Sequence, residues 1–478
     1  MKIKHGFLAY LLSFVGFVFG ACLVMVCIMM FSPGTSIFGL VYVRQNEEAT
    51  ISDYAENENA VTIKPFNTYK SVTIENIVTD ENGNFVSYGD YQIKFTAGMR
   101  DIASSNVYIR NHKNGLAKQK EKGKFNVSVT SINDDLTVTI AQYKTWISFS
   151  SDCYVEVRVP AALDVSNVKF IAKTGSGNVV FGERNLKDSQ GYNFKALAFE
   201  AETTSGGISV SNLASASSQI TLETISGSIN LDGETNCSEV SLSSENGRIK
   251  GKTMTLNSLI IHTKKSQIDL GDVSGNLIIN GENTVVRMGK LQGSVNATED
   301  AKIINLKLAS VTGDVGIPKG QAVTFESGIV EGNVNIVTEK GSILIGTNAL
   351  KEAKKGVLGR ADIFTTSGDI SVVLSQDNTK LVNLKTVSGK ILAYFENGST
   401  RRNIITESGD IELNLLHSIS TKLICSTEKE ISFDWEDKVY SDDIVWANIT
   451  GTEDVEGSSI YASSKSGKIK VYRMAAFV

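Results

Sequence analysis

The feature that most limits the possible folds of this chain is a short step that recurs at a nearly constant interval. Each copy is a small residue, a glycine, a variable residue and an aliphatic residue, as in Ser408-Gly409-Asp410-Ile411. Intervals of 19 to 21 residues occur in three series: Gly206, Gly227 and Gly247; Gly293, Gly313 and Gly332; and Gly368, Gly389 and Gly409. About 20 residues make one coil of a solenoid whose coils stack as parallel strands. The spacing therefore predicts an all-β fold with a parallel β-solenoid at residues 173–478.

The residues around each glycine indicate how a coil is built. Glycine permits a positive φ or close approach to the coil below, so it is expected to mark a corner. In Asp410-Ile411-Glu412-Leu413 the alternation sends aliphatic side chains inward and polar ones outward, at the strand period of two. Gly275 and Gly341 lie nine residues after Ser266 and Gly332. They predict a second corner on the same coil.

The period also predicts the extent of the stack. From Gly177 to Gly467 it allows roughly fourteen coils, with the right-handed crossover that parallel strands nearly always adopt. Lys429 lies 20 residues after Gly409, and the 38 residues from Lys429 to Gly467 correspond to two further steps. The stretch from Lys351 to Gly359 interrupts the series, and we interpret it as a solvated loop or a partner contact.

The region before the first coil is expected to cap the stack. The chain has 41 Gly and only 4 Pro, which suits short strands joined by tight turns. Residues 61–172 alternate as strands without the 20-residue period, and Tyr154 to Pro160 is an example. A β-rich cap at 61–172 covers the open apolar end of a solenoid and prevents end-to-end association.

The N-terminal segment predicts a compartment. The 26 residues from Gly6 to Phe31 carry no charge, enough to cross a hydrocarbon core of about 30 Å as a helix. Lys2 and Lys4 precede it, which places the N-terminus in the cytoplasm. This predicts a transmembrane anchor at 1–32, a polar stalk at 33–60 and a large extracytoplasmic domain on the cell membrane.

Two other interpretations of the N-terminal segment are less consistent with its length. A cleaved signal peptide has an apolar region of only about 7 to 15 residues. A lipoprotein signal ending at Cys22 requires a polar sequence next, but apolar residues continue from Leu23 to Phe31.

Three sets of residues resemble a known family. They are the strand end Val157-Arg158-Val159-Pro160, the run Lys173-Thr174-Gly175-Ser176-Gly177-Asn178-Val179, and the later Thr-x-Ser-Gly-Asp-Ile copies. These are similar to the bacterial putative-adhesin family, a domain of unknown function built from S-G-D-I steps, and to adhesin-head domains. The resemblance covers roughly residues 120–478. It implies a β-helix in a cell-envelope protein, often membrane-anchored and sometimes associated with envelope-stress signalling, with no catalytic residues to transfer.

Charge and motifs argue against several classes of function. The net charge of -5, from 47 basic and 52 acidic residues, provides no strongly basic surface for nucleic acid. Ser205-Gly206-Gly207-Ile208 lacks the aspartate of a calcium-binding nonapeptide, and no phosphate-binding loop occurs. The histidines are isolated and the cysteines after the N-terminal run are far apart: His5, His112, His262 and His417, and Cys153, Cys237 and Cys425. We interpret these cysteines as small buried apolar residues.

An enzyme remains an alternative, because parallel β-helices can host carbohydrate-active enzymes with clustered carboxylates. Asp314, Asp369 and Asp410 occupy the same turn position, which Lys390, Glu430 and Lys468 occupy in other coils. At two coils, or about 10 Å, Asp369 and Asp410 are widely spaced for a shared carboxylate pair. A solvent column of alternating charge explains them better, and we predict no catalytic, cofactor-binding or metal-binding residue and no enzymatic activity.

The leading functional hypothesis is an adhesin-like or scaffold protein of the cell envelope, which presents the polar flank of the solenoid to surface proteins or glycans. An accessory role in envelope-stress sensing is the second hypothesis, with contacts through the N-terminal helix. Trp146, Trp435 and Trp446 suggest either an aromatic sugar-binding platform or packing in the core or cap.

Overall fold

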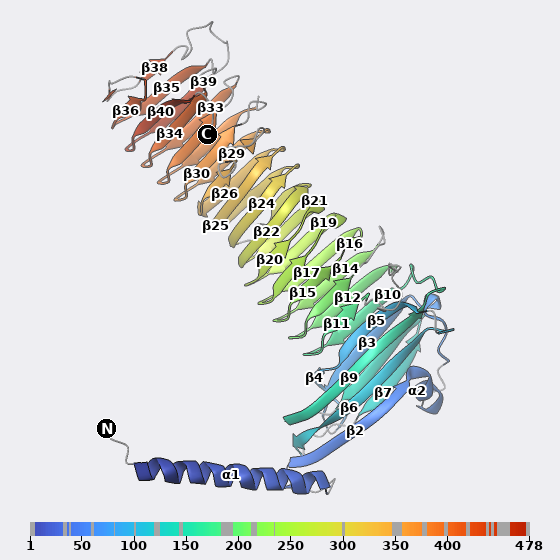
Figure 1. Cartoon of the computed structure of the whole chain (residues 1–478). Helices are drawn as coiled ribbons and strands as arrows, with labels where there is room; N and C mark the ends of the chain where they lie inside the picture. Colours follow the sequence, from blue (N-terminus) through green and yellow to red (C-terminus); the bar gives the residue numbers. More distant parts are fainter. Residues whose placement is uncertain are drawn as a thin grey trace. The chain divides into compact units, whose positions relative to one another are not determined.

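The computed structural model consists mainly of β-strands (Figure 1). It describes residues 5–31, 36–37, 40–58, 62–80, 82–99, 102–118, 125–142, 147–182, 195–211, 218–233, 235–298, 302–346, 356–374, 380–395, 400–416, 421–435, 439–440, 444–446 and 459–474. The chain divides into two compact units. Unit 1 comprises Met1–Tyr192 and Glu200–Ile208, and unit 2 comprises Asn193–Phe199 and Ser209–Val478. The solenoid predicted from residue 173 thus begins inside unit 1.

The N-terminal apolar run forms helix α1 (His5–Phe31). Among the described residues, however, no helix combines the length and the apolarity that a membrane crossing requires. The predicted anchor at 1–32, and with it the single-pass localisation on the cell membrane, is therefore wrong.

The segment predicted as a stalk at 33–60 instead contributes to the sheet of unit 1. β2 (Leu40–Thr50) pairs antiparallel with β6 (Asn106–Lys118), and β6 pairs antiparallel with β9 (Ile147–Pro160). Helix α2 (Ile51–Glu58) follows directly, and the Ile51 side chain is fully buried. The polar residues of β2 indicated a solvated linker, but a strand with one solvated face carries polar residues as well.

The rest of unit 1 contains parallel pairings. β3 (Ser71–Thr79) lies between β8 (Asp135–Gln142) and β10 (Lys169–Thr174), and β5 (Gln92–Met99) lies between β9 and β11 (Val179–Phe181). Short elements complete the unit: β1 (Ser36–Ile37), η1 (Phe66–Thr68), β4 (Phe85–Tyr88) and β7 (Asn126–Ile132). The region predicted as a cap without the period therefore already contains the parallel pairing of the solenoid.

Unit 2 is a β-solenoid of stacked strands (Figure 1). Its parallel strands pair in register on three faces, which we call A, B and C. Face A contains β14 (Gln219–Thr224), β17 (Glu239–Ser244), β19 (Met254–Thr263), β21 (Val273–Gly281), β23 (Val295–Ala297), β25 (Val315–Val330), β26 (Val334–Lys340), β29 (Ala361–Thr365), β31 (Val382–Thr386), β33 (Arg401–Thr406), β39 (Ser459–Ser464) and β35 (Lys422–Thr427).

Face B contains β15 (Ile229–Asp232), β18 (Arg248–Gly251), β20 (Gln267–Leu270), β22 (Asn283–Gln292), β24 (Ile303–Val311), a further part of β25, β27 (Ile343–Ile345), β30 (Ile370–Leu374), β32 (Ile391–Phe395), β34 (Ile411–Leu416), β40 (Ile469–Met474) and β36 (Ile431–Phe433). Face C consists of β16 (Thr235–Asn236), β28 (Gly356–Val357) and parts of the long strands β19, β21, β22, β24 and β25. The remaining strands are β12 (Ala198–Thr203), β13 (Ile208–Ser211), β37 (Val439–Tyr440) and β38 (Ile444–Trp446).

The core of unit 2 is a set of aliphatic columns. On face B, Ile229, Ile249 and Ile268 are direct partners in successive strands, and all three have no exposed surface. Each fully buried side chain of this size contributes about 1.5–3 kcal/mol, but only when the coils above and below cover it. The predicted alternation of inward aliphatic and outward polar residues is therefore confirmed, and so is the solenoid.

The Thr-x-Ser-Gly corner binds consecutive coils to each other. Thr406 Oγ1 accepts the backbone N–H of Gly409 at 3.0 Å and donates to the carbonyl of Gly389, one coil earlier, at 3.4 Å. A Cβ atom on Gly409 would lie 1.8 Å from that same carbonyl oxygen. Close approach of two backbones, rather than a positive φ, therefore requires the glycine here.

The predicted second corner is confirmed, but the glycines divide between the corners differently. Gly275, Gly293, Gly313 and Gly332 all precede strands of face A, whereas Gly341 precedes a strand of face B. The sequence grouped Gly293, Gly313 and Gly332 with the later face B series because both corners repeat at the same interval. Only strand pairing separates the two.

The last coil departs from sequence order. β39 pairs with β33 on one edge and with β35 on the other, and β40 likewise lies between β34 and β36. The interval from Lys429 to Gly467 is therefore not two steps upward, as predicted, but one step back, because β40 lies between β34 and β36, the strand that follows Lys429. Of the predicted insertion between Lys351 and Gly359, residues 351–355 lie outside the described residues, and Gly356 and Val357 form β28.

Candidate functional site

The aspartates of the enzyme hypothesis hydrogen-bond to the backbone of the next coil. Asp369 Oδ1 accepts the N–H of Lys390 at 2.8 Å, and Asp410 Oδ1 accepts the N–H of Lys468 at 2.8 Å. Asp314 makes the same bond to the N–H of Asn333 at 2.7 Å, but at the corner before face A instead of face B. The sequence placed all three aspartates at one turn position, but in the structure they do not share one column.

Uncharged side chains make the same bond in other coils. The acceptors are Asn178, Asn276, Ser294 and Asn333, with donor–acceptor distances of 2.8, 3.0, 3.1 and 3.0 Å. This position therefore requires an oxygen acceptor and not a negative charge. Asp369 and Asp410 lie in the same column on either side of Lys390.

The outward side chains of face B form a charged column. Its members are direct partners in successive strands: Lys250, Asp269, Arg287, Lys307 and Glu326. Lys307 Nζ lies 2.8 Å from Glu326 Oε1, and Arg248 reaches Asp269 at 2.5 Å from a neighbouring position. Burial alone would raise the pKa of Asp269, but the hydrogen bond and charge of Arg248 lower it overall. The charges of this column are thus largely paired with one another.

The equivalent outward column of face A carries few charges. We call it the amide column, and its members are Asn296, Asn335, Asp362, Asn383, Asn403 and Tyr461, with Gly316 between the first two. Asn383 Nδ2 donates to Asp362 Oδ1, and Asn403 Nδ2 donates to Asn383 Oδ1 at 2.7 Å. Arg360 Nε lies 2.6 Å from Asp362 Oδ2 and balances its charge.

Side chains beside the amide column add apolar surface. Phe364 and Lys385 are direct partners two residues further along the strands, at the next outward position, and Lys385 Nζ lies 5.9 Å from the centre of the Phe364 ring. Ile405 continues this second line on the next strand, and Phe364 and Ile405 are half-buried. The face thus combines planar amides with flat and branched apolar groups.

Unit 1 contains a small polar pocket with a volume of about 210 Å³. It is lined by three strands: Arg44, Gln45 and Asn46 of β2; His112, Lys113 and Asn114 of β6; and Ser150, Ser151 and Asp152 of β9. Lys113 is almost fully buried, with 3% of its side chain exposed, and its Nζ lies 2.9 Å from Asp90 Oδ2.

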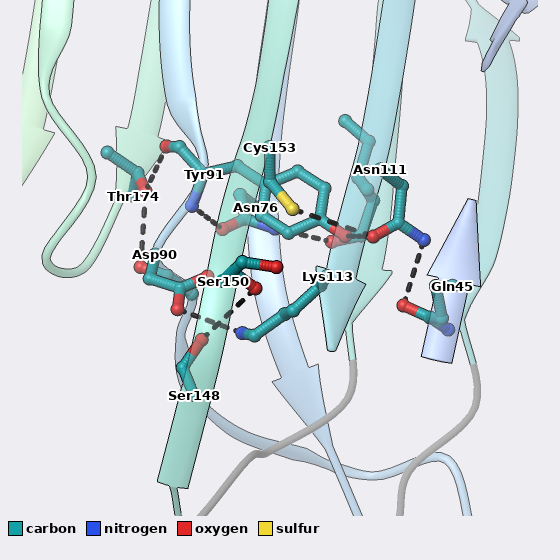
Figure 2. Close-up of polar contacts among 12 residues, drawn as sticks. Gln45, Asn76, Asp90, Tyr91, Asn111, Lys113, Ser148, Ser150, Cys153 and Thr174 are labelled. Atoms are coloured by element: carbon teal, nitrogen blue, oxygen red, sulfur yellow. Dashed lines mark hydrogen bonds and ion pairs between the residues drawn. The ribbon is translucent and has the colours of Figure 1, made fainter. Parts of the chain in front are cut away.

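A hydrogen-bond network lies beside this pocket (Figure 2). The Tyr91 hydroxyl donates to Asn111 Oδ1, and Asn111 Nδ2 donates to Gln45 Oε1 at 2.9 Å. The Tyr91 N–H donates to Asn76 Oδ1 at 2.9 Å, and Thr174 Oγ1 donates to the Tyr91 carbonyl at 3.0 Å. Burial raises the pKa of Tyr91. The network joins β2, β3, β6 and β10 and satisfies their buried polar groups. In later corners, two glycines lie in contact at the equivalent place.

The edge of the pocket carries a cluster of titratable side chains. Glu48 accepts the Tyr108 hydroxyl at 2.6 Å and lies 3.4 Å from Arg110 Nε and 3.1 Å from His112 Nε2. The hydrogen bond from Tyr108, with the charges of Arg110 and His112, lowers the pKa of Glu48 and raises that of Tyr108 to about 12. His112 looks isolated in the sequence, because its partner Glu48 comes from a strand more than 60 residues away.

The size of the pocket argues against its being the principal site. Small-molecule sites usually enclose about 300–1,000 Å³, whereas this pocket has about 210 Å³. Its most buried cation, Lys113, already has the Asp90 carboxylate as partner. The amide column of face A is the candidate site that we favour.

The remaining residues considered from the sequence do not form a site within the described part of the chain. Cys237 and Cys425 are buried as predicted, while Cys153 is half-buried and contacts Asn111. Trp435 packs 5.0 Å from the Phe433 ring, Trp146 lies outside the described residues, and so does the side chain of Trp446. No group of three His, Cys, Asp or Glu is placed to hold a metal ion among the described residues.

The fold and the corner motif define a class, a β-solenoid whose coils are joined by Thr-x-Ser-Gly steps. The family model described as Toastrack DUF4097 matches residues 86–471, which is most of the chain. This chain belongs to that family. The resemblance to a domain of unknown function of the adhesin type, inferred from the sequence, is confirmed.

Solved structures also match over most of their length. They include a putative cell adhesion protein from Clostridium sporogenes (7% identity, TM-score 0.16, covering 90% of this chain and 100% of that one). Putative adhesins from Parabacteroides merdae (10%, TM-score 0.20, 90% and 96%) and Bacteroides fragilis (10%, TM-score 0.17, 92% and 98%) match as well. These TM-scores are too low to indicate a shared arrangement of the whole chain. A search of the curated proteins found no match.

Proposed function

We propose that this chain is a non-catalytic, adhesin-like binding protein that holds an extended neutral glycan along the amide column of face A. The observation that supports this most is the contrast between two outward columns, the charged column of face B, which ends at Glu326, and the amide column of face A, which continues into later coils. On face B the charged residues neutralise one another in pairs such as Lys307 and Glu326. On face A the column offers amide donors and acceptors with little charge.

The chemistry of face A suits sugars. Neutral polyhydroxylated ligands require donors and acceptors in equal measure, and a side-chain amide supplies both. The hydrogen bonds between Asn403, Asn383 and Asp362 hold these amides in one orientation, which reduces the entropy lost on binding. Tyr461 at the end of the column, and Phe364 beside it, provide apolar surface for the carbon–hydrogen faces of a sugar.

The repetition of the column favours a polymer over a single sugar. Successive coils repeat the same kind of group at about 4.8 Å. A ligand with repeating units engages several of them at once, so that weak individual contacts add to a useful affinity. Binding in this mode requires no catalytic group, which agrees with the structural use of Asp369 and Asp410 at the corners.

Binding of the full-length chain to an array of neutral and acidic glycans tests this proposal. Asn335→Lys places a charge in the amide column at an exposed position, and Lys307→Asn alters the charged column of face B at another. We expect Asn335→Lys to weaken binding of a neutral polymer at least tenfold and Lys307→Asn to leave it unchanged, with equal thermal stability.

Three outcomes contradict the proposal. The chain binds no neutral glycan, the two variants weaken binding equally, or the chain cleaves the glycan. In the last case, loss of turnover in Asp369→Asn with unchanged stability would support the carbohydrate-active enzyme instead.

A further inference from the structure

The C-terminal strand pair occupies a slot within unit 2 that the chain leaves open on its first passage. Both edges of β39 are used, one by β33 and the other by β35. Both edges of β35 are used as well, by β39 in parallel and by β38 in antiparallel orientation. The coil of β35 and β36 therefore joins the preceding coils through β39 and β40, and Figure 1 shows β40 between β34 and β36.

The strand pair is held in the slot by the same kinds of corner hydrogen bond and ion pair that join other coils. On one side, the N–H of Lys468 donates to Asp410 Oδ1 at 2.8 Å and Ser464 Oγ donates to the Gly409 carbonyl at 2.9 Å. On the other side, Thr427 Oγ1 donates to the Gly467 carbonyl at 2.7 Å, and Lys468 Nζ lies 2.7 Å from Glu430. The insert thus completes a corner of both neighbouring coils.

The insert also supplies a layer of core. Ile460, Ala462, Ile469 and Val471 are essentially without exposed surface. Without them, the inward aliphatic residues of two coils and the edges of four strands would be open to water. Open parallel edges of this kind pair readily with any strand of matching register.

We infer that residues 459–474 are an exchangeable strand pair, and that a second copy of this chain can donate its own 459–474 into the slot between β33–β34 and β35–β36. The slot fits the sequence of residues 459–474, which has aliphatic residues at the inward positions and glycine at position 467. A second copy of this chain carries the same sequence and is therefore the donor. A Cβ atom at Gly467 would lie 2.0 Å from the Gly409 carbonyl oxygen, so a larger residue cannot enter. Reciprocal donation joins two copies as a closed pair.

A synthetic peptide of residues 459–474 tests the slot in the full-length chain. Gly467→Val in the chain weakens its own insert and frees the slot for the peptide. We expect the wild-type peptide to bind this variant at one per chain and at least tenfold more tightly than it binds the wild-type chain. The reason is that the wild-type insert competes at an effective concentration on the order of millimolar.

Two altered peptides provide the matched comparison. A peptide carrying Gly467→Val is expected not to bind, because of the clash with the Gly409 carbonyl. A peptide carrying Lys465→Ala changes an exposed side chain two residues away and is expected to bind as the wild type does. Equal binding of the Gly467→Val and wild-type peptides, or no binding to a folded Gly467→Val chain, overturns the inference.

A second measurement remains decisive if the Gly467→Val chain does not fold. Two differently tagged populations of the wild-type chain are mixed at high concentration, diluted and captured through one tag. Ser426 and Ser463 are direct partners on β35 and β39, so a disulfide between cysteines at both positions locks the insert in its own chain. Exchange is supported if wild-type chains are captured together and the disulfide lock prevents this co-capture. No co-capture, or co-capture that the lock leaves unchanged, refutes it.

Discussion

Asp369 offers the most direct test of how the corners hold the coils together. Its carboxylate accepts the N–H of Lys390 at 2.8 Å, and both groups lie at the surface. Asp369→Ala removes the acceptor and leaves that N–H to water. A hydrogen bond of this kind contributes about 0.5–1.5 kcal/mol, because water replaces part of it. We therefore expect Asp369→Ala to lower the free energy of unfolding by about 1 kcal/mol.

Asp369→Asn separates the hydrogen bond from the charge. The amide oxygen of Asn333 accepts the N–H of Arg360 at 3.0 Å at the equivalent point of the other corner, so asparagine is competent in this role. We expect this variant to stay within about 0.5 kcal/mol of the wild type, as surface substitutions usually do. A catalytic carboxylate would behave differently, since Asn would remove activity and leave stability unchanged.

Urea unfolding followed by circular dichroism measures the global effect. With a slope of about 1–3 kcal/mol per molar urea, a loss of about 1 kcal/mol lowers the midpoint by about 0.3–1 M. Hydrogen exchange at the Lys390 amide measures the local effect, with a rise of about fivefold expected in Asp369→Ala. Equal destabilisation by Ala and Asn, or an unchanged Lys390 exchange rate in the Ala variant, would falsify this account of the corner.

Three further predictions concern other parts of the chain. Gly409→Val should destabilise unit 2 by at least about 1–3 kcal/mol in urea unfolding, because its side chain meets a backbone carbonyl, whereas Glu407→Val, at an exposed position, should not. The hydrogen bond to Glu48 raises the pKa of Tyr108 to about 12. This bond should therefore stabilise unit 1 fully below about pH 10 and be lost as the pH rises through about 12. An ultraviolet titration in which Tyr108→Phe removes no late-ionising tyrosine would contradict this. Burial raises the pKa of Cys425 to about 12, so iodoacetamide at pH 8 should label it only after denaturation, as peptide mass mapping would record.

Much of the solenoid could be predicted because its signals are local. The alternation in Ile411-Glu412-Leu413 and the glycine at 409 each specify a conformation within a few residues, and stacking merely repeats it. Asp369 was assigned correctly to a solvent column, although its bond to the next coil was not foreseen. The amide column was not predicted either, since its members are about 20 residues apart and look unremarkable one at a time.

Arg402 illustrates what depends on tertiary structure. It lies at an inward position of face A, between Val382 and Ile460 in adjacent strands, and it has no exposed surface. Burial lowers its pKa to about 10. In the sequence Arg401-Arg402 gives no indication which of the two faces inward, because a shift of one residue exchanges the two faces of a strand.

The amino-acid sequence alone determined the repeat, the glycine corner and the inward direction of the alternating aliphatic side chains, because these follow from the period of a single strand and the space that glycine leaves. Tertiary structure decided which corner each glycine serves, that β2 joins a sheet, and that β39 and β40 return between two earlier coils. These three features depend on which strand edges are still unpaired when a later segment of the chain folds. Edges become available only through the pairing of segments far apart in the chain, and no local pattern records that pairing.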